Sequence, residues 1–251
     1  MARVLTDEST LTLKQKALLK ETDTLSRLVR IEAVLAVFLL VSGVVLYFWR
    51  GQAGVFWLGA AATIFFAGHF MKIRQNRLEE KRVQAGLRGE TQVTRALAEK
   101  LDNTHYVLND ITVRMGRQSA QIDHLVVSPR GLCVIETKNW RGHLEGGEQD
   151  DRWTQTRKPG DHPVRVSNPL RQVRRHIEFL SGALRRGGLD WPDLYGILVF
   201  TSPYTTFTVN TDAIPVMKPH DAVAYIANKE TERTYSEEEI SKALNLFVGE
   251  G

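Results

Sequence analysis

Two carboxylates and a lysine lie on neighbouring apolar segments, at positions that could hold a metal ion. Residues 121–127 and 132–138 are rich in apolar and β-branched side chains, and the connector between them contains Pro and Gly, so an antiparallel hairpin is predicted. In the register that this four-residue connector sets, Asp123 lies opposite Glu136. Alternation along the second strand puts Lys138 on the same face as Glu136. The hairpin is therefore predicted to bring two carboxylates and an ammonium group together.

This arrangement needs a compensating charge, and a divalent cation is the natural candidate. Like charges directly across a ladder destabilise it, and buried carboxylates without partners are costly. Mg²⁺, or Mn²⁺ in its place, takes carboxylate, carbonyl and water ligands, and Lys138 could hold or polarise a water molecule beside the metal. The alternative is that Glu136 and Lys138 form a solvated pair at a sheet edge, while Asp123 merely begins a strand. The Glu-x-Lys pattern alone does not decide between the two interpretations.

The composition fits a folded protein whose positive charge is concentrated in its N-terminal third. The chain has 251 residues, of which 43% are hydrophobic and 25% charged. Residues 1–82 contain 12 Lys and Arg against 7 Asp and Glu, whereas residues 83–251 contain 21 against 22. The net charge of +4 is therefore no sign of nucleic-acid binding. The single cysteine, Cys133, excludes an intrachain disulfide and is expected to fill the core on the strand face opposite Glu136.

Two apolar segments, residues 31–49 and 53–73, each have the length of a membrane-spanning helix. Only three residues separate them, so a tight transmembrane hairpin is expected, with Trp49 and Trp57 as interfacial aromatics near the turn. A cleaved signal peptide does not fit, because the first apolar run begins about thirty residues into the chain. The alternative is a helical hairpin buried in a soluble protein, but the nearly charge-free helix faces argue against it.

Basic residues flank the expected hairpin on its outer sides. Five Lys and Arg lie within residues 14–30 and five within residues 72–82, whereas the turn contains Arg50 alone. By the positive-inside tendency, the protein is expected in the cytoplasmic (inner) membrane with both termini and the soluble domain cytoplasmic. Residues 1–30 are expected to form an N-terminal cytoplasmic segment with an amphipathic helix. Small residues at positions 54–62 offer a surface on which the hairpin could form a homo-oligomer.

The rest of the chain is predicted to be an α/β domain in the order helix, strand, hairpin, helix, strand. A helix over residues 83–101 carries Glu90 within its apolar stripe, where a carboxylate that points to the core needs a partner. The alternative for Glu90 is a loose first turn, where an acid is favourable near a helix N-terminus. Residues 142–160 are predicted to be a loop anchored by Trp153. The other predicted elements are strands at 106–113, 195–201 and 214–217 and helices at 168–186, 221–228 and 236–248.

The helix at residues 168–186 has polar groups that could face a ligand. Asn168 is predicted to cap it, and Gln172 borders its apolar stripe and could reach toward the sheet. Arg171, Arg174 and Arg175 occupy an adjoining face, which could bind phosphates of a nucleic acid. A solvated helix face explains the three arginines equally well.

Five ordered motifs in residues 83–201 resemble the NERD, or nuclease-related, domain, a branch of the PD-(D/E)XK restriction-endonuclease-like superfamily. The motifs are Gly86-Leu-Arg-Gly-Glu90, Gln121-Ile-Asp123-His, Ile135-Glu136-Thr-Lys138-Asn-Trp-Arg-Gly, Trp153 and Asn168-Pro-Leu-Arg-Gln172. The resemblance implies a restriction-endonuclease-like core with a mixed central sheet flanked by helices. It leaves out the N-terminal hairpin and residues 202–251, a C-terminal extension, although membrane-attached members of the family are familiar.

Together with the expected transmembrane hairpin, the resemblance leads to the hypothesis of a membrane-anchored, Mg²⁺-dependent nuclease, with DNA favoured over RNA as the substrate. Asp123 and Glu136, with the Thr137 carbonyl, would hold the metal, and Glu90 would complete the ligand set directly or through water. Lys138 would orient the attacking water, and Gln172 would position water or phosphate.

Gln121 departs from the family pattern, because members often have an acid at this position. The predicted register puts Gln121 opposite Lys138, as a hydrogen-bond partner rather than a metal ligand.

A second function class is a membrane-tethered nucleic-acid binding or scaffolding protein whose nuclease fold does not cut. The near-neutral charge of residues 83–251 favours it, because DNA enzymes usually offer a broad basic groove. The intact set of acids and lysine argues against it.

Overall fold

The computed structural model describes residues 1–5, 10–50 and 54–248. They divide into two compact units, Thr10–Ala85 and Met1–Ser9 together with Gly86–Gly251. Helix α2 (Gly54–Lys100) contributes its first part to the former unit and its last turns to the latter.

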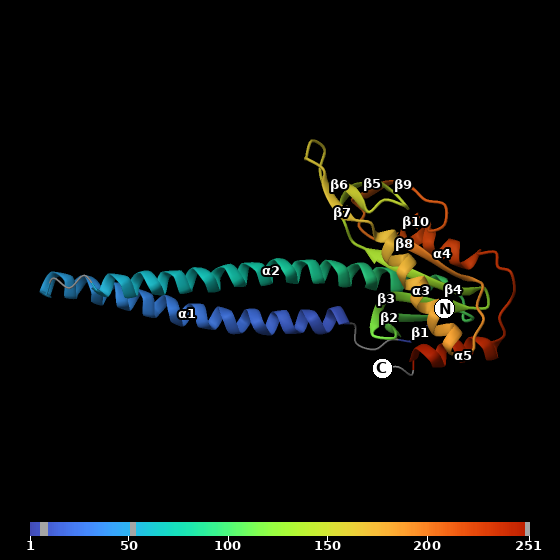
Figure 1. Cartoon of the computed structure of the whole chain (residues 1–251), viewed down its shortest axis with the longest axis horizontal. Coiled ribbons are helices and arrows are strands. Elements are labelled where there is room, and N and C mark those ends of the chain that lie inside the picture. Colours follow the sequence, from blue (N-terminus) through green and yellow to red (C-terminus); the bar gives the residue numbers. More distant parts are fainter. Residues whose placement is uncertain (6–9, 51–53, 249–251) are drawn as a thin grey trace. The chain divides into compact units, whose positions relative to one another are not determined.

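A helical hairpin makes up the unit Thr10–Ala85. Helix α1 (Thr10–Arg50) and the first part of α2 run antiparallel beside each other (Figure 1). Ion pairs between the two helices join Lys14 to Glu79 at 2.7 Å, Glu21 to Lys72 at 3.5 Å and Glu32 to His69 at 2.8 Å. Such partly exposed pairs contribute little to stability individually, so their main effect is on the alignment of the helices.

One stretch of α1, Thr10–Val45, is long and apolar enough to cross a membrane, and no second one is found among the residues that the structure describes. Only 6% of its most apolar window is buried, unlike the core helix of a soluble protein. Phe38 and Val41, for example, are 66% and 58% exposed. This exposed apolar surface fits a lipid environment better than water.

The structure therefore supports one of the two expected transmembrane helices, and the second, at residues 53–73, stays a prediction because most of its side chains lie outside the described residues. Residues 53–73 belong to α2, which continues without a break to Lys100, so the helix expected at 83–101 is its C-terminal end. The expected amphipathic helix near the N-terminus is likewise the first part of α1. Residues 51–53, where most of the expected turn falls, lie outside the described residues, as do the side chains of Trp49, Trp57 and residues 54–62.

Six strands form the central sheet of the second unit, in the order β1-β2-β3-β4-β8-β10. β3 is antiparallel to β2 and β4, whereas β4–β8, β8–β10 and β1–β2 are parallel pairs, so the predicted mixed sheet of an α/β fold is confirmed. The strands are β1 (Arg3–Leu5), β2 (Tyr106–Met115), β3 (Gln118–Ser128), β4 (Gly131–Lys138), β8 (Leu194–Phe200) and β10 (Val216–Met217).

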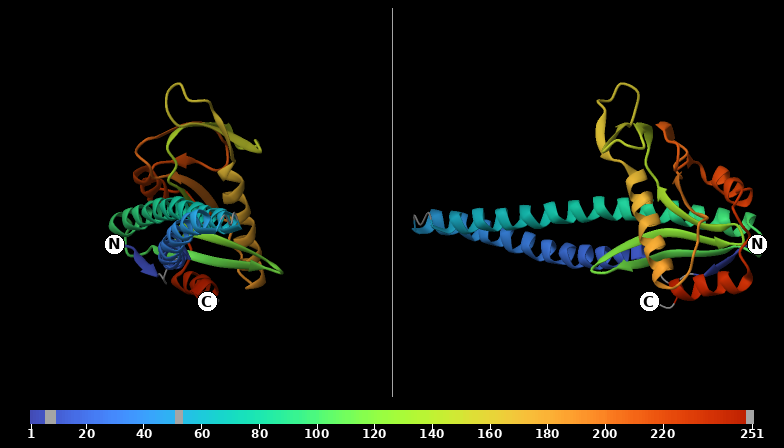
Figure 2. Two further views of the ribbon diagram at one scale, coloured as in Figure 1. Left: turned by 90° about the vertical axis from the view of Figure 1, so that its left-hand side faces the viewer. Right: turned by 45° about the vertical axis from the view of Figure 1, so that its right-hand side comes forward.

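Helices cover both faces of this sheet (Figure 2). α3 (Pro169–Arg186) and α5 (Glu237–Val248) pack on the face that includes Leu125. The last turns of α2 and α4 (Pro219–Ala227) pack on the other face, which includes Cys133. Cys133 is fully buried among apolar side chains, as expected for a residue that fills the core.

The β3–β4 hairpin has the predicted register, but its ladder stops short of the two carboxylates. His124 pairs with Ile135, and the next position along would pair Asp123 with Glu136. Instead, Asp123 Oδ2 accepts a hydrogen bond from the backbone N–H of Thr137 at 2.8 Å. The strands separate at this point, so the two acids are not locked into a regular cross-strand pair.

A second sheet corrects the loop expected at residues 142–160. Its order is β7-β6-β5-β9, and its inward side chains Leu144 and Trp153 are fully buried. The sequence here is rich in Gly, Asp, Glu and Arg, so its alternation is too polar to indicate strands. β1 and β9 were not predicted either, because their partners are far away in the chain. The strands of this sheet are β5 (Gly142–Gly147), β6 (Arg152–Thr156), β7 (Val164–Ser167) and β9 (Thr205–Asn210).

Helix starts follow the predicted capping chemistry. Asn168 Oδ1 accepts a hydrogen bond from the backbone N–H of Leu170 at 2.9 Å, with Pro169 in the first turn of α3. Before α5, the Glu239 carboxylate accepts from the backbone N–H of Ser236 at 2.8 Å, and the Ser236 hydroxyl accepts from the N–H of Glu239 at 3.3 Å. These contacts form the capping box that the sequence predicts.

Candidate functional site

Three carboxylates lie in one row where β3 separates from β4 and continues along β2. The β2–β3 ladder pairs the residues on either side of Asp110 with those on either side of Asp123, so these two acids stand opposite each other. Asp123 in turn takes the position across from Glu136. Asp110 has a φ of 54°, a left-handed conformation that Asp tolerates better than most residues.

Lys138 and Gln172 join this row from the end of β4 and the start of α3. Lys138 Nζ donates a short hydrogen bond to Glu136 Oε1 and a second one to Gln172 Oε1 at 3.1 Å. The Glu136 side chain is only 1% exposed, whereas that of Lys138 is 21% exposed. Three residues that the sequence singled out therefore meet, with Glu136 buried, Lys138 partly exposed and Gln172 exposed.

Glu90 comes from α2, beside a glycine that brings the helix close to the ends of β4 and β8. A Cβ on Gly89 would lie 2.8 Å from Thr201 Oγ1 and 3.2 Å from Asn139 Cβ, so a larger residue would push the helix away. Glu90 is half-buried within this continuous helix, so the alternative of a loose first helical turn is wrong. The glycine of the Gly-x-x-Gly-Glu motif thus positions the carboxylate near Asp123 and Lys138, whose charges shift its pKa.

The acids disfavour each other's ionisation. Burial and, after it, the charge of Asp123 raise the pKa of Glu90 and of Glu136 to about 8, although Lys138 acts to lower both. Burial also raises the pKa of Asp123, against the lowering effect of Lys138 and of the Thr137 N–H. Burial would lower the pKa of Lys138, but Glu136 and Asp123 raise it above its usual range. One ammonium group does not neutralise this set of carboxylates.

The donor atoms of this cluster fit a hard cation. Glu136 Oε2 is buried and has no hydrogen-bond partner in the part of the chain that the structure describes. Oxygen ligands of this kind suit Mg²⁺ or Mn²⁺. Among the described side chains, however, no three His, Cys, Asp or Glu residues are close enough together to hold a metal ion. A metal bound by three of these acids would therefore require their side chains to rearrange.

Gln121 does not pair with Lys138, so that expectation is wrong. Gln121 pairs with Thr112 of β2, and its amide donates a short hydrogen bond to Asp110 Oδ1. The hairpin ladder ends before it reaches this position, because β3 leaves β4 and continues along β2 alone. Gln121 therefore holds Asp110, an acid on the neighbouring strand.

Three functional candidates near this row were missed by reasoning from the sequence. Asp110 gave only a weak signal, the polar Asn-Asp pair inside an otherwise apolar strand. His176 is 3% exposed, and its Nδ1 lies 3.4 Å from Glu136 Oε2. His124 is 1% exposed, with Nδ1 2.6 Å from Asn109 Oδ1. Burial lowers the pKa of His176 to about 4 and that of His124 to about 3, so both are neutral at pH 7.

The three arginines of α3 differ in their partners. Arg171 forms a short ion pair with the exposed Asp151, and Arg175 lies over the Phe179 ring at 5.2 Å. Arg174 donates to Glu148 Oε1 at 2.7 Å. All three border a cleft of about 570 Å³ beside Gln172. The cleft is lined by Met115, Gln118, Arg171, Gln172, Arg174, Arg175, Glu178 and Phe179.

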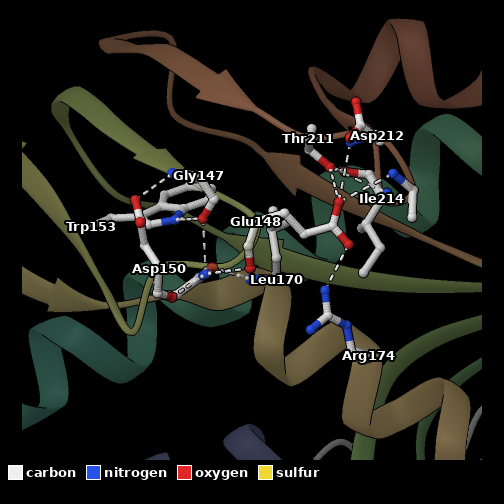
Figure 3. Close-up of polar contacts among 11 residues, drawn as sticks. Gly147, Glu148, Asp150, Trp153, Leu170, Arg174, Thr211, Asp212 and Ile214 are labelled. Carbon is white, nitrogen blue, oxygen red and sulfur yellow. Dashed lines mark hydrogen bonds and ion pairs between the residues drawn. The ribbon is translucent and has the colours of Figure 1, made fainter.

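Glu148 joins α3, the second sheet and the segment before β10 (Figure 3). Its Oε2 accepts hydrogen bonds from the Thr211 hydroxyl at 2.9 Å and from the N–H groups of Asp212 at 3.2 Å and Ala213 at 3.1 Å. Burial alone would raise the pKa of Glu148, but these donors and Arg174 lower it to about 2. Arg174 therefore serves first to hold the fold together at the rim of the cleft.

Comparison with known proteins identifies the domain that carries these residues. Residues 85–201 match the family model of the nuclease-related domain. An uncharacterized protein of Bacillus anthracis is 38% identical over 96 residues, which cover 37% of this chain and 43% of that protein. The probable kinase PglW of Streptomyces coelicolor is 38% identical over 68 residues, which cover 27% of this chain and 4% of that protein.

The chain spans less than half the length of either of these relatives. No solved structure matches the chain. The matched segment contains Glu90, Asp123, Glu136, Lys138 and Gln172. The chain therefore contains, at residues 85–201, a segment that matches the nuclease-related domain family.

Proposed function

We propose that this protein is a nuclease that hydrolyses phosphodiester bonds of DNA with the help of Mg²⁺ or Mn²⁺. The observation that carries the proposal is the meeting of Asp123, Glu136 and Lys138 at the point where β3 and β4 separate. Like-charged groups with raised pKa values are common at catalytic sites, which supports a catalytic role for this cluster. The family that residues 85–201 match supports the same chemistry.

The roles follow from the position of each side chain. Asp123, Glu136 and Glu90 would hold the cation, which supplies Lewis-acid polarisation of the phosphoryl oxygen when bound. Lys138 is more exposed than Glu136, so its ammonium group can orient the attacking water and stabilise charge on the phosphoryl oxygens. Gln172 holds Lys138 from α3 and positions water or phosphate beside it. Hydrolysis adds the water oxygen to phosphorus and breaks one P–O ester bond, and the departing oxygen takes up a proton.

The cleft next to Gln172 is the proposed path of the DNA backbone. Its arginines Arg171, Arg174 and Arg175 gather positive charge in a domain that is near neutral overall. Arg175 is exposed and has no carboxylate partner among the described residues, so it is the arginine best placed to bind a phosphate.

The proposed nuclease is held at a membrane through its N-terminal hairpin. The exposed apolar surface of Thr10–Val45 supports this location. The basic residues that flank the apolar segments favour a cytoplasmic position for the domain.

The alternative remains a nucleic-acid binding or scaffolding protein that does not cut. Two observations favour it: the near-neutral charge of residues 83–251 and the absence of a ready three-residue metal site among the described side chains. A folded protein that binds DNA and metal without turnover would establish this second function.

The deciding experiment uses the full chain, purified in detergent, with supercoiled, linear and single-stranded DNA and with RNA. Each substrate is incubated with Mg²⁺, Mn²⁺ or EDTA, beside Lys138→Ala and the control Lys100→Ala, which alters an exposed lysine at the end of α2. Metal-dependent cleavage that persists in the control and disappears in Lys138→Ala is expected. Cleavage by a folded Lys138→Ala protein would refute the proposed mechanism.

A further inference from the structure

One exposed aromatic side chain follows the end of β8, the strand whose last residue pairs with the proposed catalytic lysine. Tyr204 is 70% exposed, and no other aromatic residue in the described part of the chain from Gly86 onward is exposed. The Arg141 guanidinium lies 5.4 Å from the centre of its ring. A large ring that is left in water beside a cation is a common feature of binding surfaces.

Arg141 and Tyr204 lie in the two connections that join the central sheet to the second sheet. β4 and β8 are parallel neighbours in the central sheet, and the same two chain segments continue as the parallel neighbours β5 and β9 in the second sheet. Arg141 lies in the first connection, three residues after Lys138, and Tyr204 lies in the second. The Thr201 N–H donates to the Lys138 carbonyl at 3.1 Å, so both connections start at the catalytic strand end.

Hydrogen bonds hold both connections in place. Lys218 Nζ donates to the carbonyls of Ser202 and Thr205, each at 2.8 Å, on either side of Tyr204. The Gly142 N–H donates to the Tyr204 carbonyl at 2.9 Å, and the Thr205 hydroxyl donates to the Trp140 carbonyl. The ring is therefore presented by an ordered loop, which reduces the entropy lost when a ligand binds.

The chemistry of this pair selects one kind of ligand. One face of the Tyr204 ring is covered by Arg141, and the exposed ring surface suits stacking on a planar group. Arg141 has no carboxylate partner among the residues that the structure describes, so its charge is available to a phosphate. Bases in a duplex are stacked inside and cannot reach such a ring, whereas unpaired bases can.

We propose that Arg141 and Tyr204 form a stacking platform that binds an unpaired base of single-stranded nucleic acid next to the Lys138 strand end. The inference rests on the proposed nuclease function and narrows its substrate to single strands or to unpaired segments of a duplex. Tyr204 contributes base stacking, and Arg141 contributes a contact to the phosphate backbone. The pair is a binding element and takes no part in bond cleavage.

The test measures binding of fluorescent 15-nucleotide strands to the full chain in detergent, with EDTA present to prevent cleavage. The probes are a single strand of oligodeoxythymidine, the same strand paired with its complement, and a single strand with abasic sites. The variants are Tyr204→Ala, Tyr204→Trp, Arg141→Gln and the control Arg185→Gln, which removes one exposed charge at the far end of α3.

Tyr204→Ala is expected to weaken binding of the single strand about 5- to 100-fold while it leaves the abasic strand unchanged. Tyr204→Trp should retain the affinity, because it retains a ring. Arg141→Gln should lower the slope of log affinity against log salt by roughly 0.7, whereas Arg185→Gln should not. The platform is refuted if wild type and Tyr204→Ala bind the intact single strand equally well. It is also refuted if Tyr204→Ala loses as much affinity for the abasic strand as for the intact strand.

Cleavage measured in parallel separates this inference from the function on which it rests. If the wild type cuts DNA and Tyr204→Ala binds and cuts as well as the wild type, the platform is wrong and the nuclease stands. If Tyr204 governs binding but no metal supports cleavage, the platform stands and the nuclease is wrong. If the wild type binds none of the three probes, the platform is refuted.

Discussion

Glu136, which is buried, and Glu148, which is partly buried, are carboxylates of the same unit that each pair with a basic side chain, yet their surroundings are opposite. Glu148 has four donors on its two oxygens, and although burial alone would raise its pKa, these donors lower it to about 2. Glu136 shares the positive charge of Lys138 with Asp123 and Glu90, has one oxygen without a hydrogen bond among the described residues, and has a pKa that burial and Asp123 raise to about 8. A carboxylate whose hydrogen bonds are complete holds elements together, whereas one whose charge is unbalanced is available for a ligand.

The largest effect is expected when the charge of Glu136 is removed. Glu136→Gln keeps the size of the side chain but removes the charge that would hold the cation. We expect the rate of DNA cleavage to fall roughly 100-fold or more, because metal catalysis contributes several kcal/mol. Steady-state cleavage assays with Mg²⁺ measure the effect. The exposed Glu145→Gln is the control, and full activity in Glu136→Gln would remove Glu136 from the mechanism.

Substitution of Glu148 should instead lower the stability of the fold. Glu148→Ala leaves Arg174 and three other donors without their acceptor, which is expected to cost about 3 kcal/mol. Thermal unfolding followed by circular dichroism should show Tm lower by roughly 6–12 °C. The exposed Glu145→Ala on the neighbouring strand should change Tm little. An unchanged Tm in Glu148→Ala would mean that its donors find other partners.

The two environments also predict opposite pH dependence. Between pH 6.5 and 8 the carboxyls of unfolded chains are ionised, whereas Glu136 and Glu90 still hold protons in the folded state because their pKa is raised to about 8. The folded state therefore loses protons as pH rises, and metal-free stability should fall by about 1–2 kcal/mol per group across this range. Urea unfolding in EDTA should show a smaller decline for Glu136→Gln. A steeper decline in the variant would contradict the raised pKa.

The lowered pKa of Glu148 affects stability only at acidic pH. Its stabilisation is present above the ordinary carboxyl pKa and is lost as pH falls toward about 2, so Glu148 adds no slope between pH 6.5 and 8. Glu148→Gln and the wild type should therefore unfold with parallel pH profiles in this range, which separates the two carboxylates in one experiment.

The smallest expected effects concern the arginines of the cleft. Arg175→Gln should weaken DNA binding severalfold, because Arg175 has no carboxylate partner among the described residues. It should also lower the slope of log affinity against log salt concentration by the amount expected for about one phosphate contact. Arg174→Gln should mainly lower Tm, because Arg174 holds Glu148. Binding by fluorescence anisotropy at several salt concentrations distinguishes the two variants. Equal losses of binding in both would assign Arg174 to the DNA path as well.

Reasoning from the sequence located the hairpin register and the residues that meet at its end. Apolar alternation and a short Pro- and Gly-containing connector are local signals, so they were sufficient to predict that the position of Asp123 faces that of Glu136. The capping residues Asn168 and Ser236 were predictable for the same reason. Predictions that needed long-range partners failed more often, as with the second sheet, strand β1 and the partner of Gln121.

The sequence by itself determined the mixed α/β character, the caps, the hairpin and the identity of the acids and lysine, because periodicity and turn chemistry act over a few residues. Only the tertiary structure decided that β3 leaves β4 at Asp123, that Asp110 joins the row of acids, and that Glu148 rather than a phosphate holds Arg174. It also placed Tyr204 and Arg141 side by side, although 62 residues lie between them in the chain. Such contacts depend on how distant strands are stacked, and no local pattern records which distant residue will supply the missing hydrogen bond or charge.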